Sequence, residues 1–229
     1  MERGAPMSRR ERPAKPALSQ ETIVDAAMTL LDSDGLDGVS MRRVAQALDT
    51  GPASLYVYVR NRDELVGLLI DRISGEIPVP VVRPGGDWRK QLGDLMLASI
   101  RELGRHPGIA EALFATVPTS PNALAVTDAM LGLLTQGGLS RQARAWAVDA
   151  LGLYIAAAGA EESLHAARDQ IAHREAEIHP AARDIFAGLS ADRYPNITDL
   201  HEELTYGSTE QRTRWGIDVL INGILATPA

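Results

Sequence analysis

The feature that most constrains the fold is the stretch of residues 39–61, which reads VSMRRVAQALDTGPASLYVYVRN. Two apolar patterns of helical spacing flank the break DTGP at residues 49–52, so they predict two short helices joined by a tight turn. Ser40 is expected to N-cap the first helix, because its hydroxyl can accept a backbone N–H of the first turn. The second helix is expected over about residues 53–59, with Leu55 in the core. This arrangement is typical of a helix-turn-helix, whose second helix enters the major groove of DNA.

The motif is also recognisable at the level of a family. Residues 55–65, LYVYVRNRDEL, and the segment SMRRVAQAL that begins at Ser40 resemble the DNA-binding domain of the TetR family of transcriptional regulators. The resemblance is strong over about residues 18–69. The segment HPGIAEAL from His106 and the end of the chain resemble the tetracycline-repressor branch. The resemblance implies an all-α protein, with an N-terminal three-helix helix-turn-helix DNA-binding domain and a C-terminal helical ligand-binding and dimerisation domain.

Prolines and apolar spacing divide the chain into three parts. Residues 1–17 combine basic side chains with three prolines and lack periodicity, which predicts a disordered basic arm. Residues 18–62 are expected to form the helix-turn-helix domain. Residues 63–229 are expected to form the ligand-binding and dimerisation domain, to which a helix over residues 62–76 connects the head. From residue 87 onward the apolar spacing is helical, and no strand is expected.

Capping patterns locate the individual helices. Ser19 is expected to cap the first helix without a capping box, since Thr22 stands where Glu or Gln is usual. Asn61 with Glu64 predicts a capping box for the connecting helix. The remaining helices are expected over residues 87–105, 107–116, 122–136, 140–172 and 208–225, with a loop over residues 189–198.

Composition excludes several classes of function. The chain has no cysteine, so it has neither a disulfide framework nor a thiol nucleophile. Its longest apolar run is too short to span a bilayer, and we expect a cytoplasmic protein with no membrane partner. The net charge is −7, but residues 1–62 carry nine Lys and Arg against eight Asp and Glu, whereas residues 63–229 carry fourteen against twenty-two. Favourable contacts with phosphates are therefore expected at the N-terminal head.

No pattern of a catalytic, cofactor or metal site stands out. Glu162 and His165 have the spacing of a carboxylate-bridged di-iron ligand pair, but such sites need a second pair, and the sequence offers none. Glycine-rich phosphate loops and serine-hydrolase motifs are also missing. We therefore expect no enzymatic activity, no cofactor and no metal.

The expected DNA contacts follow from position in the resembled motif. Ser40, Tyr58 and Arg62 are expected on phosphates, and Arg42 on a base edge or the backbone. Arg43 is expected to be solvated or to face a phosphate. The start of the recognition helix is expected to reach base edges, and Tyr56 is expected to contact the DNA backbone or a sugar. For Tyr56 and Tyr58 the alternative is that they pack within the small head domain. The recognition-helix residues are Pro52, Ala53, Ser54, Tyr56 and Tyr58. Without a long bidentate side chain at its start, we expect modest direct readout together with readout of DNA shape.

The effector pocket is expected inside the C-terminal core. Its candidate lining residues are Leu95, Ser99, Leu103, Leu113, Phe114, Thr116, Val117, Thr127, Met130, Trp146 and Tyr154, with plain core packing as the alternative for each of them. The tetracycline-repressor branch holds its magnesium-bound drug with histidine, asparagine and aromatic side chains. Leu95, Ser99 and Leu113 stand nearest to those positions here, so we expect an apolar or weakly polar effector instead.

Two glycine pairs point to close helix packing. Gly152 and Gly159 lie seven residues apart on one predicted helix, and Gly216 and Gly223 on another, so each pair shares a face. A glycine inside a helix costs roughly 1 kcal/mol against alanine, and close approach of another helix would offset that cost. We expect these helices to form an intersubunit four-helix bundle, with intrachain packing as the alternative. The predicted interface residues are Ala147, Leu151, Gly152, Ala158, Gly159, Trp215, Gly216, Val219, Leu220, Gly223 and Ile224.

Together these features predict a ligand-responsive, DNA-binding transcriptional regulator. We expect a homodimeric repressor, which binds a palindromic double-stranded operator and which a small-molecule effector releases. One alternative is an activator or ligand-stimulated DNA binder of the same fold. The other is a small-molecule binding protein whose DNA-binding head is vestigial.

Overall fold

The computed structural model describes residues 17–115, 119–172 and 180–227, and the regular structure within these ranges is entirely helical. In chain order the elements, with 3₁₀ turns written η, are α1 (Gln20–Asp34), η1 (Leu36–Gly38), α2 (Met41–Ala47), α3 (Pro52–Leu55), α4 (Arg62–Glu76), α5 (Trp88–Gly104), α6 (Ile109–Ala112), η2 (Leu113–Ala115), α7 (Pro121–Gln136), α8 (Arg141–Ala172), α9 (Pro180–Ala187), α10 (Pro195–Asp199), α11 (His201–Thr205) and α12 (Thr209–Ala226). The all-α fold is as predicted. The predicted basic arm lies, apart from Ala17, outside the described residues.

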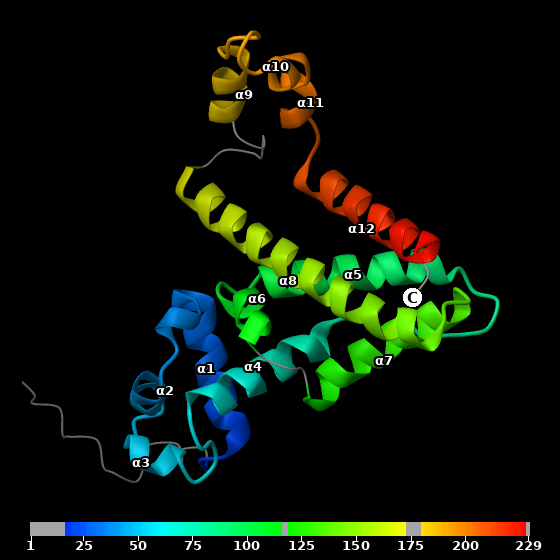
Figure 1. Cartoon of the computed structure of the whole chain (residues 1–229). Coiled ribbons are helices and arrows are strands. Elements are labelled where there is room, and N and C mark those ends of the chain that lie inside the picture. Colours follow the sequence, from blue (N-terminus) through cyan, green and yellow to red (C-terminus); the bar gives the residue numbers. More distant parts are fainter. Residues whose placement is uncertain (1–16, 116–118, 173–179, 228–229) are drawn as a thin grey trace, which may run out of the picture.

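The helices α1, α2 and α3 form a small head, from which α4 leads into the C-terminal domain (Figure 1). The core of the head consists of fully buried side chains from every one of its helices: Ile23 and Leu31 from α1, Val44 from α2 and Leu55 from α3. Leu65 of α4 is equally buried. Burial of one such aliphatic side chain stabilises a fold by about 1.5–3 kcal/mol, so the connecting helix is anchored to the head by its apolar face.

Side-chain caps begin most of the longer helices. Ser40, Asp87 and Ser208 accept the N–H of the third residue after them, and the cap at Ser40 is as predicted. At α1 the prediction was wrong, because Ser19 and Thr22 do form a capping box. The Thr22 hydroxyl oxygen accepts the Ser19 backbone N–H at 2.9 Å, so threonine replaces the usual Glu or Gln there.

The cap of α4 also differs from its prediction in one half. The Asn61 Oδ1 accepts the Glu64 N–H at 2.8 Å, as expected. However, the Glu64 carboxylate accepts the Arg60 N–H at 2.6 Å and not that of Asn61. The Arg60 guanidinium also donates to this carboxylate, at 3.1 Å, so the Glu64 carboxylate accepts two hydrogen bonds from Arg60.

Three predicted element boundaries need correction. The recognition helix α3 spans Pro52–Leu55 and is therefore shorter than expected, since residues 56–58 form a turn. The helix predicted over 107–116 begins after Gly108, whose φ of 88° requires glycine, and it ends in a 3₁₀ turn. The predicted loop over 189–198 contains the start of α10 at Pro195, where the fixed φ of proline suits a first helical position.

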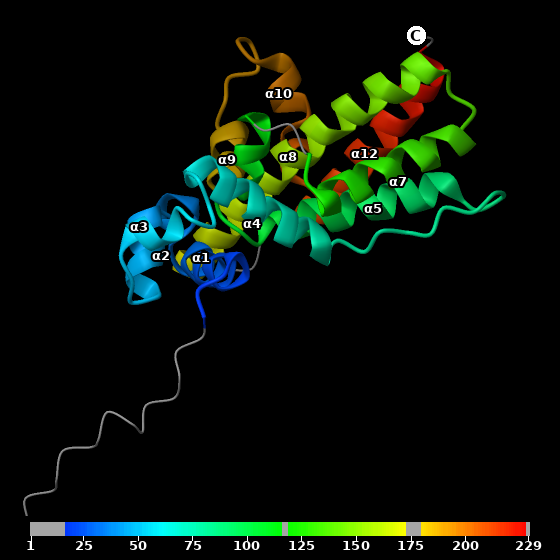
Figure 2. The ribbon, with the colours of Figure 1, turned by 90° about the horizontal axis from the view of Figure 1, so that it is seen from below.

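The C-terminal domain is built around α5, which packs against α7, α8 and α12. Figure 2 shows the head at one end of this stack of long helices, and Figure 1 shows the short helices α9–α11 beyond the C-terminal half of α8. The core between the long helices contains Leu92, Met96, Ile100, Leu133, Leu151, Ile155, Ile217 and Ile221. Within the described residues, no helix is long and apolar enough to cross a membrane.

Candidate DNA-binding head and effector groove

The recognition helix is held by two buried side chains and leaves its start open. Leu55 and Val59 are fully buried in the head, so the turn of α3 cannot rotate without exposing them. Pro52, Ala53 and Ser54 are all exposed at the N-terminal end of α3. This end therefore presents small side chains that fit against base edges, where they can contact a thymine methyl group or exchange one hydrogen bond.

The two tyrosines after α3 are only partly buried. Tyr56 is 51% exposed and Tyr58 is 39% exposed, so neither ring is absorbed into the core. The Gln20 amide of α1 donates to the Tyr58 carbonyl at 3.3 Å, which fixes the backbone at this point. Both side chains therefore stay accessible to solvent, where their hydroxyls could donate to a phosphate oxygen.

The three predicted arginine contacts differ in their surroundings. Arg42 is exposed in the first turn of α2. Arg43 instead donates to the Gly38 carbonyl at 2.9 Å and to the carboxylate of Asp34. Arg62 donates from Nε to the Val39 carbonyl at 3.1 Å and from an Nη atom to the Leu36 carbonyl at 3.0 Å. Arg43 and Arg62 therefore hold the connection between α1 and α2. Sequence reasoning missed this role, because their partners lie up to 26 residues away.

Most of the predicted effector residues fill the protein core or lie on its surface. Leu95, Leu103 and Met130 are buried in the packed core. Ser99 donates its hydroxyl to the Leu95 carbonyl at 2.8 Å, and Thr127 donates to the Ala123 carbonyl at 3.0 Å, so both hydroxyls are used within their own helices.

The other candidate residues of the effector pocket lie in different places. Leu113 is partly buried and packs against the core. Phe114 and Trp146 are 55% and 62% exposed, so they line no interior cavity in this chain. Thr116 and Val117 lie outside the described residues. Of the predicted residues that the structure describes, Tyr154 lines a cavity that an effector could occupy.

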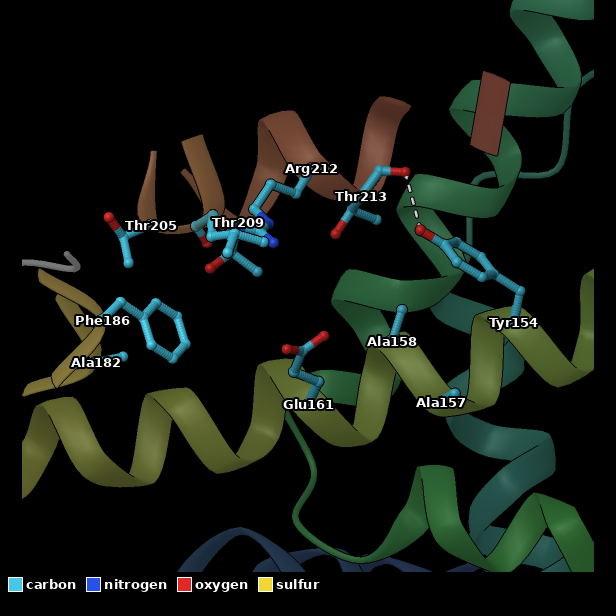
Figure 3. Close-up of a pocket in the computed structure, with 11 residues that line it drawn as sticks. Tyr154, Ala157, Ala158, Glu161, Ala182, Phe186, Thr205, Thr209, Arg212 and Thr213 are labelled. Carbon is cyan, nitrogen blue, oxygen red and sulfur yellow. Dashed lines mark hydrogen bonds between the residues drawn. The ribbon is translucent and has the colours of Figure 1, made fainter. Parts of the chain in front are cut away.

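That cavity is a groove of about 520 Å³ between α8, α9, α11 and α12. Figure 3 shows Tyr154, Ala157, Ala158 and Glu161 on α8 facing the side chains from the other three helices. Its further lining residues are Ala182, Phe186, Leu204, Thr205, Thr209, Arg212 and Thr213. A volume of this size falls in the range of about 300–1,000 Å³ that small-molecule sites occupy. We call it the α8–α12 groove.

Hydrogen bonds fix two polar groups of the α8–α12 groove. The Tyr154 hydroxyl donates to the Thr213 carbonyl at 3.2 Å, which ties α8 to α12 (Figure 3). Burial raises the pKa of this hydroxyl, and the negative charge of Glu161 raises it further, so the phenol stays protonated and remains a donor. The Arg212 guanidinium donates to the Leu204 carbonyl at 3.0 Å and keeps further N–H donors for a ligand.

The predicted dimer residues divide into an inner and an outer set. Ala147 and Leu151 are buried within the chain, so their place in a dimer interface was wrong. Gly159 also faces inward: a Cβ added to it would lie 3.2 Å from the Leu103 Cβ. A Cβ at Gly104 of α5 would lie 3.3 Å from the Gly159 carbonyl oxygen. We call this pair of glycines, at which α5 and α8 approach closely, the glycine crossing.

Three predicted residues of α12 and one of α8 also pack within the chain. Gly216 lies against Tyr154, whose hydroxyl a Cβ there would overlap. Leu220 and Ile224 are partly buried against the core. Ala158 is partly buried and lines the α8–α12 groove.

The outer set is apolar and exposed. Trp215 is 70% exposed and Val219 is 46% exposed on α12. On α8, Trp146 and Leu153, which the sequence did not predict in the interface, are also exposed, to 62% and 54%. Added Cβ atoms at Gly152 and Gly223 would meet no atom within 4 Å, so both glycines are exposed.

Comparison with known proteins agrees with this architecture. Residues 23–69 match the family described as bacterial regulatory proteins, tetR family, and residues 80–227 match the tetracyclin repressor-like, C-terminal domain. The chain is 34% identical to an HTH-type transcriptional regulator of Saccharopolyspora erythraea, over 79% of this chain and 77% of that protein. It is 29% identical to the HTH-type transcriptional repressor DrrR1 of Streptomyces coeruleorubidus, over 94% of this chain and 80% of the relative.

Solved structures show the same fold. ActR of Streptomyces coelicolor, a TetR family protein solved in complex with actinorhodin, is 33% identical and superposes with a TM-score of 0.82. The match covers 92% of this chain and 97% of that of ActR. With matching models over the head and the C-terminal domain, the chain belongs to the TetR family of ligand-responsive, DNA-binding transcriptional repressors.

Proposed function

We propose that this protein is a homodimeric repressor, whose two heads bind a palindromic operator. A small molecule that binds in the α8–α12 groove releases the repressor from this operator. The observation that carries the DNA-binding part is the exposed start of α3 above a fully buried Leu55 and Val59. A helix anchored in this way can insert its first residues into the major groove without losing its core contacts.

Dimerisation is supported by the exposed apolar surface of α8 and α12. Two of the three tryptophans of the chain, Trp146 and Trp215, lie mostly exposed on these helices. Exposed aromatic side chains on neighbouring helices are typical of protein interfaces, in which they are strongly enriched. Two identical subunits joined by this surface would present two recognition helices, and half-sites one helical turn apart require a spacing of about 34–36 Å.

The effector part is supported by the mixed chemistry of the α8–α12 groove. Phe186, Leu204 and the alanines of α8 supply apolar walls, while Arg212 and Glu161 supply one charge of each sign. An amphipathic molecule, with an apolar body and a few hydrogen-bonding groups, fits this lining. That ActR was solved in complex with actinorhodin supports small-molecule control of this chain as well.

Release requires that the effector binds the DNA-incompetent state more tightly than the DNA-competent one. The α8–α12 groove joins two helices that also carry the proposed dimer surface. A ligand that separates or draws together α8 and α12 would therefore change the relation of the two subunits. This change alters the spacing of the two heads, on which binding to both half-sites depends.

The test is a gel shift on the intergenic DNA upstream of the gene, with excess nonspecific competitor and several salt concentrations. The expected result is a discrete complex that survives competitor, and whose affinity falls steeply with salt. The double variant Arg42→Ala, Tyr56→Ala should lose this complex while keeping its helical content by circular dichroism. If neither the upstream DNA nor a duplex selected from a random library gives a specific complex, the head does not read DNA. A promoter–reporter assay then distinguishes repression from activation.

A further inference from the structure

One histidine lies at the contact between the head and the C-terminal domain. His106 follows α5, and its imidazole Nδ1 lies 2.9 Å from the Asp32 Oδ1 at the end of α1. Its Nε2 lies 3.9 Å from the Glu102 Oε1, and Arg105 donates to the same Glu102 carboxylate at 2.6 Å. The His106 side chain is only 13% exposed. Because a carboxylate only accepts hydrogen bonds, the Nδ1–H donates to Asp32 and bridges the two domains.

The backbone at this contact is closely interlocked. The Leu36 N–H of η1 donates to the Pro107 carbonyl at 2.8 Å, directly beside His106. Gly35 and Gly108 both have positive φ, 68° and 88°. A Cβ at Gly108 would lie 2.7 Å from the Leu36 Cβ, and one at Gly35 would lie 3.3 Å from the Pro107 Cβ. The two turns therefore approach as closely as their backbones allow.

The same end of α5 is packed against α8, which forms one wall of the α8–α12 groove. At the glycine crossing, a Cβ at Gly104 would lie 3.0 Å from the Glu162 Cβ. Glu162 directly follows Glu161, which lines the groove, and Gly159 directly follows the groove residue Ala158. Interiors packed this closely transmit displacement, because little free volume can absorb it. A movement of α8 at the groove thus shifts the end of α5, which carries His106.

We propose that His106 is a positioning residue, which fixes the orientation of the DNA-binding head on the C-terminal domain through its bond to Asp32. In this proposal the glycine crossing and His106 relay movement of α8 to the head. The relay rests on the proposed function, whereas the positioning of the head does not. The bond holds the turn of η1 against Pro107, and its loss lets the head change its angle while the core of each domain stays folded.

The first test follows hydrogen exchange of the Leu36 amide, which donates to the Pro107 carbonyl across the contact. In His106→Asn the side-chain amide N–H is three bonds from Cα, as is the Nδ1 of the histidine, so it can still donate to Asp32. In His106→Gln the amide nitrogen is four bonds from Cα, as is the histidine Nε2. We expect Leu36 to exchange about tenfold or more faster in His106→Gln and Asp32→Ala, since a hydrogen bond to a charged group is lost. His106→Asn should remain near the wild-type rate.

Controls separate positioning from general loss of stability. The Val44 amide bonds to the Ser40 carbonyl inside the head and should exchange at the wild-type rate in every variant. Glu111→Gln removes a negative charge from α6 near the same contact and should leave Leu36 protected. The proposal is overturned if Leu36 exchange is unchanged in both His106→Gln and Asp32→Ala, or if His106→Asn and His106→Gln are equally affected.

The second test measures binding to the operator duplex obtained above, against a scrambled duplex of equal length. A head with a loosened angle should lose specific affinity by about tenfold in His106→Gln, with little change on the scrambled duplex, since phosphate contacts alone give nonspecific binding. Equal losses on both duplexes would overturn the positioning role. If wild-type protein binds neither duplex specifically, the proposed function fails, and the exchange experiment alone decides the role of His106.

Discussion

Alanine substitutions at Gly152 and Gly159 should affect the free energy of unfolding differently, although both glycines lie on α8 and the gain in helix propensity is the same at both. Replacing a glycine inside a helix by alanine stabilises it by roughly 1 kcal/mol. At Gly152 an added Cβ meets no atom within 4 Å, so this gain is retained. At Gly159 the Cβ would lie 3.2 Å from the Leu103 Cβ and 3.4 Å from both the Ala110 Cβ and the Ile100 carbonyl oxygen.

The magnitude follows from the packing of the glycine crossing. Overpacking of a close-packed interior costs about 1–3 kcal/mol. The helix-propensity gain is the same at both positions and cancels in the comparison. We therefore expect Gly159→Ala to be less stable than Gly152→Ala by about 1–3 kcal/mol, with Gly159→Ala at or below the wild-type free energy of unfolding.

The assay is urea-induced unfolding followed by tryptophan fluorescence, with linear extrapolation to water. It should be repeated at a tenfold higher protein concentration, because a partner subunit at Gly152 would make the effect of that variant depend on concentration. The glycine crossing lies within one chain, so the effect of Gly159→Ala should not depend on it. Two variants that agree within about 0.5 kcal/mol, the size of a typical surface effect, would refute the close approach of α5 and α8.

Three further predictions concern charge and assembly. Burial raises the pKa of the Glu162 carboxyl, although the charge of Arg101 opposes the shift. The free energy of unfolding should therefore fall as pH rises from the ordinary pKa of a glutamate through the raised pKa of Glu162. Glu162→Gln should flatten this decline in thermal melts recorded across pH, and an unchanged profile would contradict it. Trp215→Asp should convert a dimer to a monomer in sedimentation velocity, and a persistent dimer would place the interface elsewhere. Arg42→Ala should reduce the slope of log affinity against log salt by about one per subunit, and an undiminished slope would exclude a phosphate contact.

Local patterns predicted the head well. The hydroxyl of Ser40, the break before Pro52 and the burial of Leu55 are short-range matters, and the structure reproduces all three. The Ser19 capping box was missed, because Thr22 has a shorter side chain than Glu or Gln and reaches its target only in the geometry that α1 adopts. Errors at helix ends have the same origin, since tertiary contacts decide the last turn of a short helix.

Side chains with distant partners were less predictable. The motif predicts that Arg62 contacts a phosphate, yet Arg62 donates to two carbonyls in the connection between α1 and α2. Trp146 and Leu151 are both apolar positions of α8, and the packing of α8 against its neighbouring helices decides that Leu151 is buried and Trp146 exposed. Helical periodicity identifies an apolar stripe, but it does not say whether the stripe meets the same chain or a second one.

The sequence by itself determined the helical class and the helix-turn-helix, because each depends on spacings within about one or two helical turns. The family followed from the resemblance of residues 55–65 and of the segment that begins at Ser40. The tertiary structure decided where a ligand could sit and how the head is attached. The α8–α12 groove combines residues from 154 to 213, and the contact at His106 joins residues 74 positions apart. Such juxtapositions depend on how the helices cross, which amphipathic patterns constrain only to a small set of angles.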